Sequence, residues 1–309
     1  MSVLVVGSIA LDTVETPFGK VEDALGGSAV YFSASAANFH PVQVVGVVGK
    51  DFPMADLDLL RSRGVDLRGV AERDGESFRW SGVYSFDLNS RETLETRLGV
   101  FADFRAVLPE EYRNPRIAFL GNIDPELQIN VLDQVESVEL VACDTMNLWI
   151  DQSREALLRV LARTNILLVN DEEIRQLAGE PNLVKAARWV QERGAKTVIV
   201  KKGEHGAMLV DEESVFFVPG YPLEEVFDPT GAGDAFAGGF LGYLASHEQW
   251  SGEELRSAVV FGSAMGSFAV EDFSVARLSD VRMDEILERV REFRSLTTFE
   301  VPLPEAVRV

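Results

Sequence analysis

The stretch of sequence that says most about the fold of this chain is Asp228-Pro229-Thr230-Gly231-Ala232-Gly233-Asp234-Ala235-Phe236. Pro229 disfavours helical geometry in the residue before it, so we expect Asp228 to be extended. Gly231 and Gly233 permit a backbone conformation that residues with a Cβ avoid, and they let a ligand approach the main chain. Apolar residues recur at helical spacing after Asp234. The stretch therefore predicts a glycine turn that opens a helix.

The start of such a helix suits a phosphate, because its first N–H groups lack helical acceptors and lie at the positive end of the dipole. We therefore expect Gly231, Ala232 and Gly233 to form an anion hole. An acidic residue at this point would repel the phosphate if capping were its only task. Asp234 is thus expected to face a substrate hydroxyl and accept its proton as a general base. The alternative is that Asp234 caps the helix and the glycines form a packing turn.

Two other nucleotide-binding patterns do not fit the chain. A Rossmann G-x-G-x-x-G would need glycine at Phe236, and G-x-x-x-x-G-K-[ST] does not occur. A dinucleotide-binding oxidoreductase is therefore nearly excluded.

The longer string D-P-T-G-A-G-D-A-F-x-G-G-F, from Asp228 to Phe240, closely resembles the C-terminal signature of the PfkB family of ribokinase-like carbohydrate and nucleoside kinases. The resemblance extends over nearly the whole chain. It implies one α/β domain over residues 1–309 with the ribokinase-like fold, in which helices flank a mostly parallel central sheet. A small antiparallel β-sheet lid is expected from about 13–24 and 76–101. The implied reaction is transfer of the ATP γ-phosphate to a hydroxyl of a small sugar or polyol.

Acceptor contacts are expected near the N-terminus. Asp12 follows the apolar strand at residues 3–6, and open α/β sheets bind ligands beyond the carboxyl ends of their strands. Asp12 could equally stabilise a turn, and Gly26-Gly27 could be a plain tight turn. The family has a substrate-binding Asp and a G-G motif at these positions. The resemblance therefore implies acceptor contacts from Asp12, Gly26, Gly27 and Ser28, and we add Asn122, which follows the expected strand at residues 117–120.

Metal ions are also implied by the resemblance. Asn170-x-x-Glu173 is similar to the family's N-x-x-E motif, which is associated with magnesium and phosphate positioning. Glu173 would hold Mg²⁺ through water, which suits sparse carboxylates. By their position alone, these residues would be ordinary partners of a helix dipole. Asp228 and Thr230 match a monovalent-cation site of some relatives, so K⁺ is a further expected ligand.

The remaining ATP contacts are expected around a second turn. Lys202-Gly203-x-x-Gly206 resembles the family's nucleotide-binding K-G-x-x-G turn, and Lys201 or Lys202 would pair with the phosphates of ATP. A solvated lysine is the alternative. Ser263 lies on an expected helix at residues 253–270, where small side chains leave room for an adenine. A packed core helix explains the same pattern.

The acceptor itself is left open, because three positions depart from ribokinase. Ala10, Ser28 and Tyr31 stand where ribokinase has Asn, Lys and Asn. A nucleoside kinase acting on adenosine or cytidine is the alternative, since it shares every catalytic motif and the aromatic residues Tyr31, Phe78 and Trp80 would stack a base. A non-catalytic sugar sensor is a third reading, against which the retained Asp234 speaks.

Composition restricts the partners. A chain of 309 residues with 46% hydrophobic residues can bury a large core. The formal charge of −21 argues against nucleic-acid and anionic-membrane partners. The single Cys143 excludes an internal disulfide and, with no apolar run of membrane-spanning length, favours the cytoplasm. An aromatic lid could cover the substrate, pack on a second copy of the chain, or do both.

Overall fold

Short runs of branched apolar residues, such as Val3–Val6 and Ile166–Asn170, form the buried strands of a nine-stranded sheet in the computed structural model, which describes residues 2–298. The strand order is β13-β12-β11-β10-β9-β8-β1-β4-β5. The strands from β11 to β5 pair in parallel, and β12 and β13 add an antiparallel edge. Their bounds are β1 Val3–Val6, β4 Val42–Gly49, β5 Asp66–Arg73, β8 Ile117–Leu120, β9 Leu140–Cys143, β10 Ile166–Asn170, β11 Thr197–Lys201, β12 Ala207–Val210 and β13 Val215–Val218.

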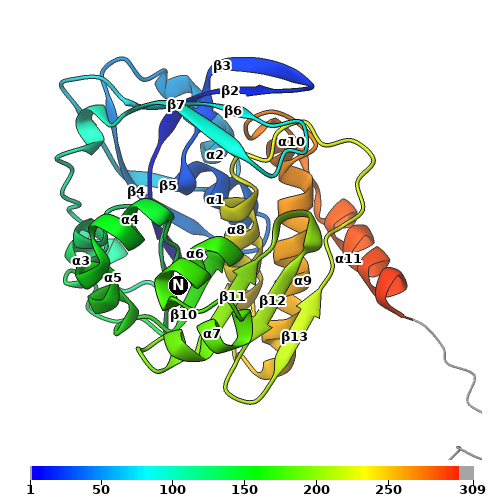
Figure 1. Cartoon of the computed structure of the whole chain (residues 1–309). Helices are drawn as coiled ribbons and strands as arrows, with labels where there is room; N and C mark the ends of the chain where they lie inside the picture. The colour runs from blue at the N-terminus through cyan, green and yellow to red at the C-terminus, as the bar shows by residue number, and fades with distance from the viewer. Residues whose placement is uncertain (1, 299–309) are drawn as a thin grey trace, which may run out of the picture.

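Helices cover both faces of this sheet, as predicted (Figure 1). One core lies between the sheet and α1, α8 and α9, and the other lies beneath α3, α5, α6 and α7. No helix in residues 2–298 combines the length and the hydrophobicity needed to cross a bilayer. The helix bounds are α1 Ser28–Ala36, α2 Asp58–Ser62, α3 Pro125–Leu132, α4 Asn147–Gln152, α5 Arg154–Leu161, α6 Asp171–Ala178, α7 Leu183–Gln191, α8 Ala232–Ala245, α9 Gly252–Ala269, α10 Ala276–Asp280 and α11 Met283–Thr297.

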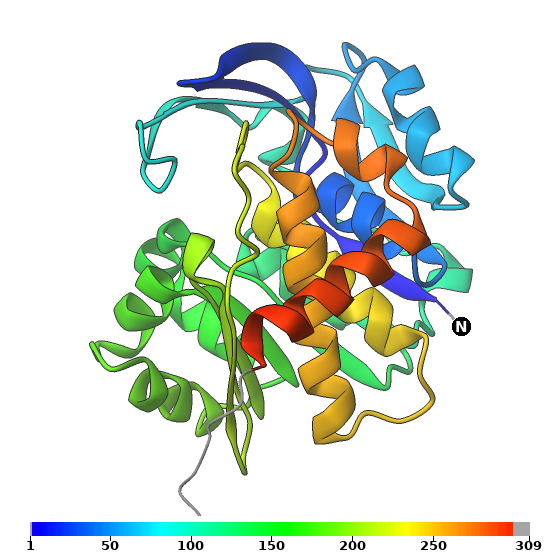
Figure 2. The same cartoon turned by 90° about the vertical axis from the view of Figure 1, so that its right-hand side faces the viewer.

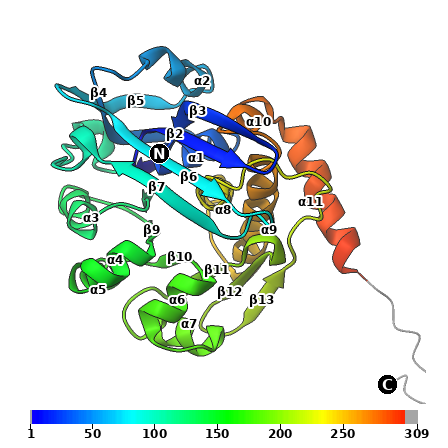
Figure 3. The same cartoon turned by 45° about the horizontal axis from the view of Figure 1, so that its top comes forward.

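A second, four-stranded sheet forms the expected lid, with the order β3-β2-β6-β7. Its strands are β2 Ala10–Thr16, β3 Gly19–Gly26, β6 Phe78–Tyr84 and β7 Arg91–Arg97. The lid is mixed rather than purely antiparallel, because β2 and β6 pair in parallel. In the sequence, β2 follows β1 and β6 follows β5. Because β1 and β5 end at the same edge of the large sheet, β2 and β6 both start from that edge and run in the same direction. The lid lies above that edge (Figures 1 and 3).

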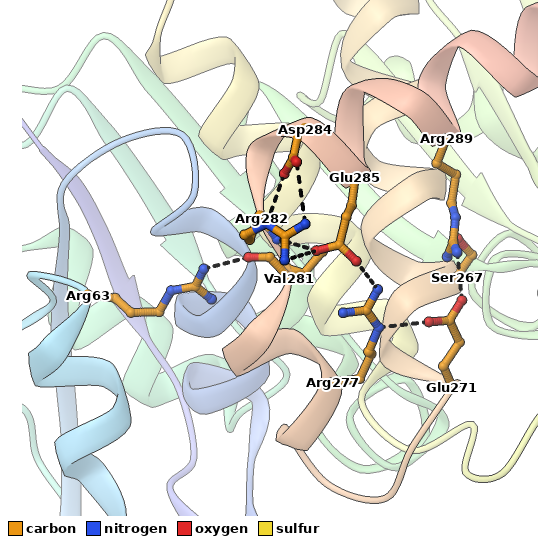
Figure 4. Close-up of polar contacts among 9 residues, drawn as sticks. All are labelled: Arg63, Ser267, Glu271, Arg277, Val281, Arg282, Asp284, Glu285 and Arg289. Carbon is orange, nitrogen blue, oxygen red and sulfur yellow. Dashed lines mark hydrogen bonds and ion pairs between the residues drawn. The ribbon is translucent and has the colours of Figure 1, made fainter.

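The C-terminal helices are fastened to the core by a charged network. Figure 2 shows α11, in red, crossing the outer side of α9. Glu271, just after α9, pairs with Arg277 of α10 at 2.9 Å and with Arg289 of α11 at 2.6 Å (Figure 4). Arg277 also reaches Glu285 at 2.7 Å. Between Glu271 and Arg277, the Ser274 N–H donates to Asp228 Oδ2 at 3.5 Å, so the network supports the turn described next.

Residue 1 and residues 299–309 lie outside the described part of the chain. The assignment of all 309 residues to one domain therefore stays a prediction.

Candidate active site

The predicted glycine turn begins α8 at the carboxyl edge of the large sheet. Gly231 is the N-cap, with the left-handed φ of 76° that favours glycine. A Cβ on it would lie 2.3 Å from the ring of Tyr31, so a side chain is excluded for a second reason. Among residues 2–298, no acceptor faces the N–H groups of Gly233 and Asp234. The start of α8 therefore has the geometry expected of an anion hole.

Asp234 lies in the first turn of α8 and is partly buried. Its pKa is raised to about 7, chiefly by burial and also by the charge of Asp144, while Lys201 and Arg91 act in the opposite direction. A carboxylate with this pKa is basic enough to accept a proton near neutral pH. The environment thus suits the predicted role of Asp234 as a general base.

The N-terminal residues expected to contact the acceptor form one side of the same site. The pKa of Asp12 is raised to about 7, chiefly by burial and also by the charges of Asp228 and Asp234. The Asp12 carboxylate fills the space beside Gly26, where a Cβ would lie 1.9 Å from Oδ2. Asp12 and the base are therefore brought together, although 222 positions separate them in the sequence.

Two residues of the predicted acceptor set have protein partners. Ser28 exchanges hydrogen bonds with Ser8: its Oγ accepts the Ser8 N–H at 3.1 Å, and its own N–H donates to Ser8 Oγ at 3.0 Å. Asn122 Oδ1 accepts from the Trp149 indole at 3.1 Å. Gly27 begins α1 as its N-cap. Acceptor contacts from these residues stay predictions.

The expected K⁺ residues lie on the turn before α8. Asp228 is 1% exposed, and its Oδ1 accepts the Thr230 N–H at 2.8 Å. Thr230 Oγ1 donates to the hydroxyl of Tyr84 at 3.1 Å, so a lid residue touches the turn. Burial raises the pKa of Asp228, and no ion pair reaches it from the rest of residues 2–298. A buried carboxylate without a cationic partner fits a site for a monovalent cation.

Asn170 and Glu173 form a capping box at the start of α6. Asn170 Oδ1 accepts the Glu173 N–H, and Glu173 Oε2 accepts the Asn170 N–H, both at 2.8 Å. The pKa of Glu173 is raised to about 7, chiefly by burial and also by the charge of Asp144, while Lys201 opposes the rise. No cluster of three or more His, Cys, Asp or Glu side chains suited to a metal occurs in the described chain. The second Glu173 oxygen, in negatively charged surroundings, fits a hydrated Mg²⁺ better than a directly bound one.

The predicted nucleotide turn follows β11. Gly203–His205 forms a 3₁₀ turn, which the Lys202 N–H closes by donating to the Gly206 carbonyl at 2.8 Å. Asn89, at the tip of the lid hairpin, donates to Glu204 in this turn at 3.1 Å. The lid therefore contacts both the D-P-T-G turn and the turn that is expected to bind the nucleotide.

Lys201 and Ser263 approach the start of α8 from different directions. Lys201 Nζ lies close to the backbone of Gly233: it is 3.1 Å from the point that a Cβ on this glycine would occupy. The helix α9 passes close to the same point, where a Cβ on Gly266 would lie 3.3 Å from the Ala232 carbonyl. Ser263 is one turn earlier on α9, and its buried Oγ has no hydrogen-bond partner in residues 2–298. Its proposed contact with adenine stays a prediction.

Sequence reasoning missed Tyr84 and Arg91. Both are on the inner face of the lid, since Tyr84 pairs with Arg91 in register. Arg91 lies over the Trp80 ring at 5.6 Å, and its charge acts on Asp12 and Asp234. Strand alternation is a usable signal for Tyr84, whereas Arg91 is placed on the inner face only by its register with Tyr84.

Comparison with known proteins agrees with this geometry. A sequence model described as "pfkB family carbohydrate kinase" matches residues 2–281. The chain belongs to the pfkB family. As a pfkB-family kinase it is a phosphotransferase with an alcohol group as acceptor.

Individual pfkB-family relatives match most of the chain. A cytidine kinase of Thermococcus kodakarensis is 32% identical over 248 residues, which are 78% of this chain and 87% of that protein. The Methanocaldococcus jannaschii nucleoside kinase structure has a TM-score of 0.77 at 21% identity and covers 94% of this chain and 99% of its own. An E. coli ribokinase II candidate in complex with ATP and Mg²⁺ has a TM-score of 0.77 at 20% identity, with the same coverages. The two structures confirm the predicted ribokinase-like fold.

Asp12→Asn should stabilise the free protein at pH 8. A folded-state pKa of about 7, above the ordinary 3.8, means that ionisation of Asp12 opposes folding as the pH rises from about 4 to 7. The free energy of unfolding therefore falls by at most about 1.4 kcal/mol per pH unit. Urea unfolding at pH 4.5 and 8 should show a stability gain that is larger at pH 8. Asp133→Asn, on the exposed surface, controls for the loss of one charge. A gain that is equal at both pH values would contradict the assignment.

Proposed function

We propose that this pfkB-family kinase phosphorylates a nucleoside, with ATP as the phosphate donor. The observation that carries the proposal is the 32% identity to a cytidine kinase over 78% of the chain. The sequence alone favoured a sugar or polyol, and the comparisons support the nucleoside alternative more strongly. A sensor without catalysis is disfavoured, because Asp234 lies beside the open N–H groups of α8.

The proposed chemistry follows from the start of α8. Asp234 accepts the proton of the acceptor hydroxyl as that oxygen forms a bond to the γ-phosphorus. The bond from phosphorus to the bridging oxygen of ADP breaks, and ADP leaves. The turn Gly231-Ala232-Gly233 stabilises the charge on the transferred phosphoryl group. Asp12 and the Gly26-Gly27 turn orient the acceptor on the opposite side.

Trp80 is the proposed platform for the base. It pairs in register with Asp12, so its side chain lies on the inner face of the lid. Its ring extends over Gly82, where a Cβ would lie 2.5 Å from the indole. Tyr31 is 1% exposed beneath Gly231, and Phe78 stacks on Phe101 at 5.7 Å. Of the three aromatic residues considered, Trp80 is therefore the one that we propose stacks on the base.

Two cations complete the proposal. Mg²⁺ neutralises charge on the ATP phosphates when it is bound, and Glu173 would hold it through water, with Asn170 fixing the Glu173 side chain. Asp228 and Thr230 would hold K⁺ beneath the anion hole. Gly203, Gly206 and Ser263 are proposed contacts of the nucleotide.

Two further predictions concern the setting of the enzyme. A homodimer through the lid stays a prediction. The outer lid face carries Arg79, Ser81, Glu95 and Arg97 around a hollow of about 240 Å³, which would then lie against the second copy. A cytoplasmic location also stays a prediction.

Asp234→Asn should abolish nucleoside phosphorylation. Removal of a general base typically lowers the rate by about 10²–10⁴-fold. The measurement is ADP release with Mg²⁺ and ATP across cytidine, adenosine, ribose, fructose and small polyols, with Asp133→Asn as the control. Turnover of a free sugar but of no nucleoside would show that the protein is a sugar kinase. Nucleoside binding without turnover would favour the non-catalytic sensor.

Trp80→Ala should weaken nucleoside binding selectively. Stacking on an aromatic ring is worth about 1–3 kcal/mol per base, so the KM for cytidine should rise about 5- to 150-fold. The KM for ribose, measured as a poor acceptor or as a competitive inhibitor constant, should change little. Trp189→Ala on α7, where Trp189 packs on Arg193, is the matched control. Equal losses for cytidine and ribose would contradict stacking.

A further inference from the structure

Lys201 and Asp144 form a buried ion pair at the carboxyl edge of the large sheet. Lys201 ends β11, Asp144 directly follows β9, and β10 lies between these strands. Nζ and Oδ2 are 2.5 Å apart, and the two side chains are 17% and 5% exposed. The pair therefore bridges two strands over the end of a third, where Asn170 begins the capping box of α6.

A buried ion pair is energetically unfavourable as a purely structural link between two strands. Each ion loses several kcal/mol of hydration, which two apolar side chains would not. The carboxylate is held from both sides, because Asp144 Oδ1 also accepts the Thr145 N–H at 2.7 Å. In residues 2–298, Asp144 is the one hydrogen-bond acceptor of the Lys201 ammonium. Two of its three N–H groups are therefore available to a ligand.

The ammonium is also charged and adjacent to the anion hole. Burial opposes the charged form, but the carboxylates of Asp144 and Glu173 outweigh it and raise the pKa of Lys201. The position of a Cβ on Gly233 is 3.1 Å from Nζ. Lys201 thus adds a full positive charge to the partial charges of the α8 N–H groups.

We propose that Asp144 is a positioning residue, which holds the Lys201 ammonium beside Gly233 so that it contacts the γ-phosphate of ATP before and during transfer. Asp144 keeps one N–H group occupied and fixes the direction of the other two. The charge is then in place before the reaction begins, as electrostatic stabilisation of a transferred phosphoryl group requires. The inference rests on the proposed anion hole and does not depend on which acceptor is used.

Nucleotide binding without an acceptor tests the role of Asp144 separately from the identity of the acceptor. Calorimetry with Mg²⁺ compares ADP with adenylyl imidodiphosphate, a non-hydrolysable ATP analogue. Asp144→Asn should weaken binding of the analogue by about tenfold, the effect of 1.4 kcal/mol, and leave the affinity for ADP within about twofold. Asp133→Asn, which breaks the exposed pair with Arg163, should change neither. Equal weakening of both nucleotides would indicate a purely structural role, and no weakening would also overturn the proposal.

A double variant protects the test against misfolding and measures the coupling. D144N/K201M removes both members of the ion pair, so neither is left as a buried charge without its partner, and the variant should fold even if Asp144→Asn does not. Its affinity for the analogue should equal that of Lys201→Met, because the two residues act as one unit. Once an acceptor is found, kcat should fall about 100-fold in the same variants while its KM changes little. If the double variant instead lost affinity by the product of the losses in the two single variants, Asp144 would not act through Lys201.

Discussion

The crowding of negative charge at the start of α8 is the constraint on which the rest of the site depends. Five carboxylates meet there from different segments: Asp12, Asp144, Glu173, Asp228 and Asp234. Burial raises the pKa of three of them to about 7, since a desolvated carboxylate repelled by its neighbours resists ionisation. Lys201 offsets part of this charge. The free site is therefore strained electrostatically and suited to receive cations with the nucleotide.

The fold brings these groups together because parallel strands end at one edge. At this edge, Asp144 follows β9, Asn170 ends β10 and Lys201 ends β11, and α8 begins at the same place. The lid comes from this edge as well, through the parallel pair β2 and β6. It reaches the D-P-T-G turn through Tyr84 and the nucleotide turn through Asn89. One small sheet consequently links the expected positions of the acceptor, the phosphate and the nucleotide.

Much of the fold and the class of reaction could be predicted from the sequence, because the signals are local. The glycine turn, the helix after it and the strands of the large sheet depend on residues a few positions apart. The inner face of the lid could not be predicted fully, since Arg91 reaches the site only through the register of β6 and β7 and the irregularity between Ser81 and Gly82. Tyr31 was expected to stack a base, yet it lies beneath Gly231, because helix α1 packs against α8. The Lys201–Asp144 pair spans 57 positions, and only the order of strands brings its members together.

The pH dependence of kcat/KM tests the central claim most directly. If Asp234 is the base and its pKa is about 7, kcat/KM for the best nucleoside should rise with pH through about 7 and then level off. The same rise should remain in Asp12→Asn, because it belongs to Asp234. A profile that is flat from pH 5 to 8 would mean that Asp234 is ionised throughout or takes no proton, and it would contradict the account.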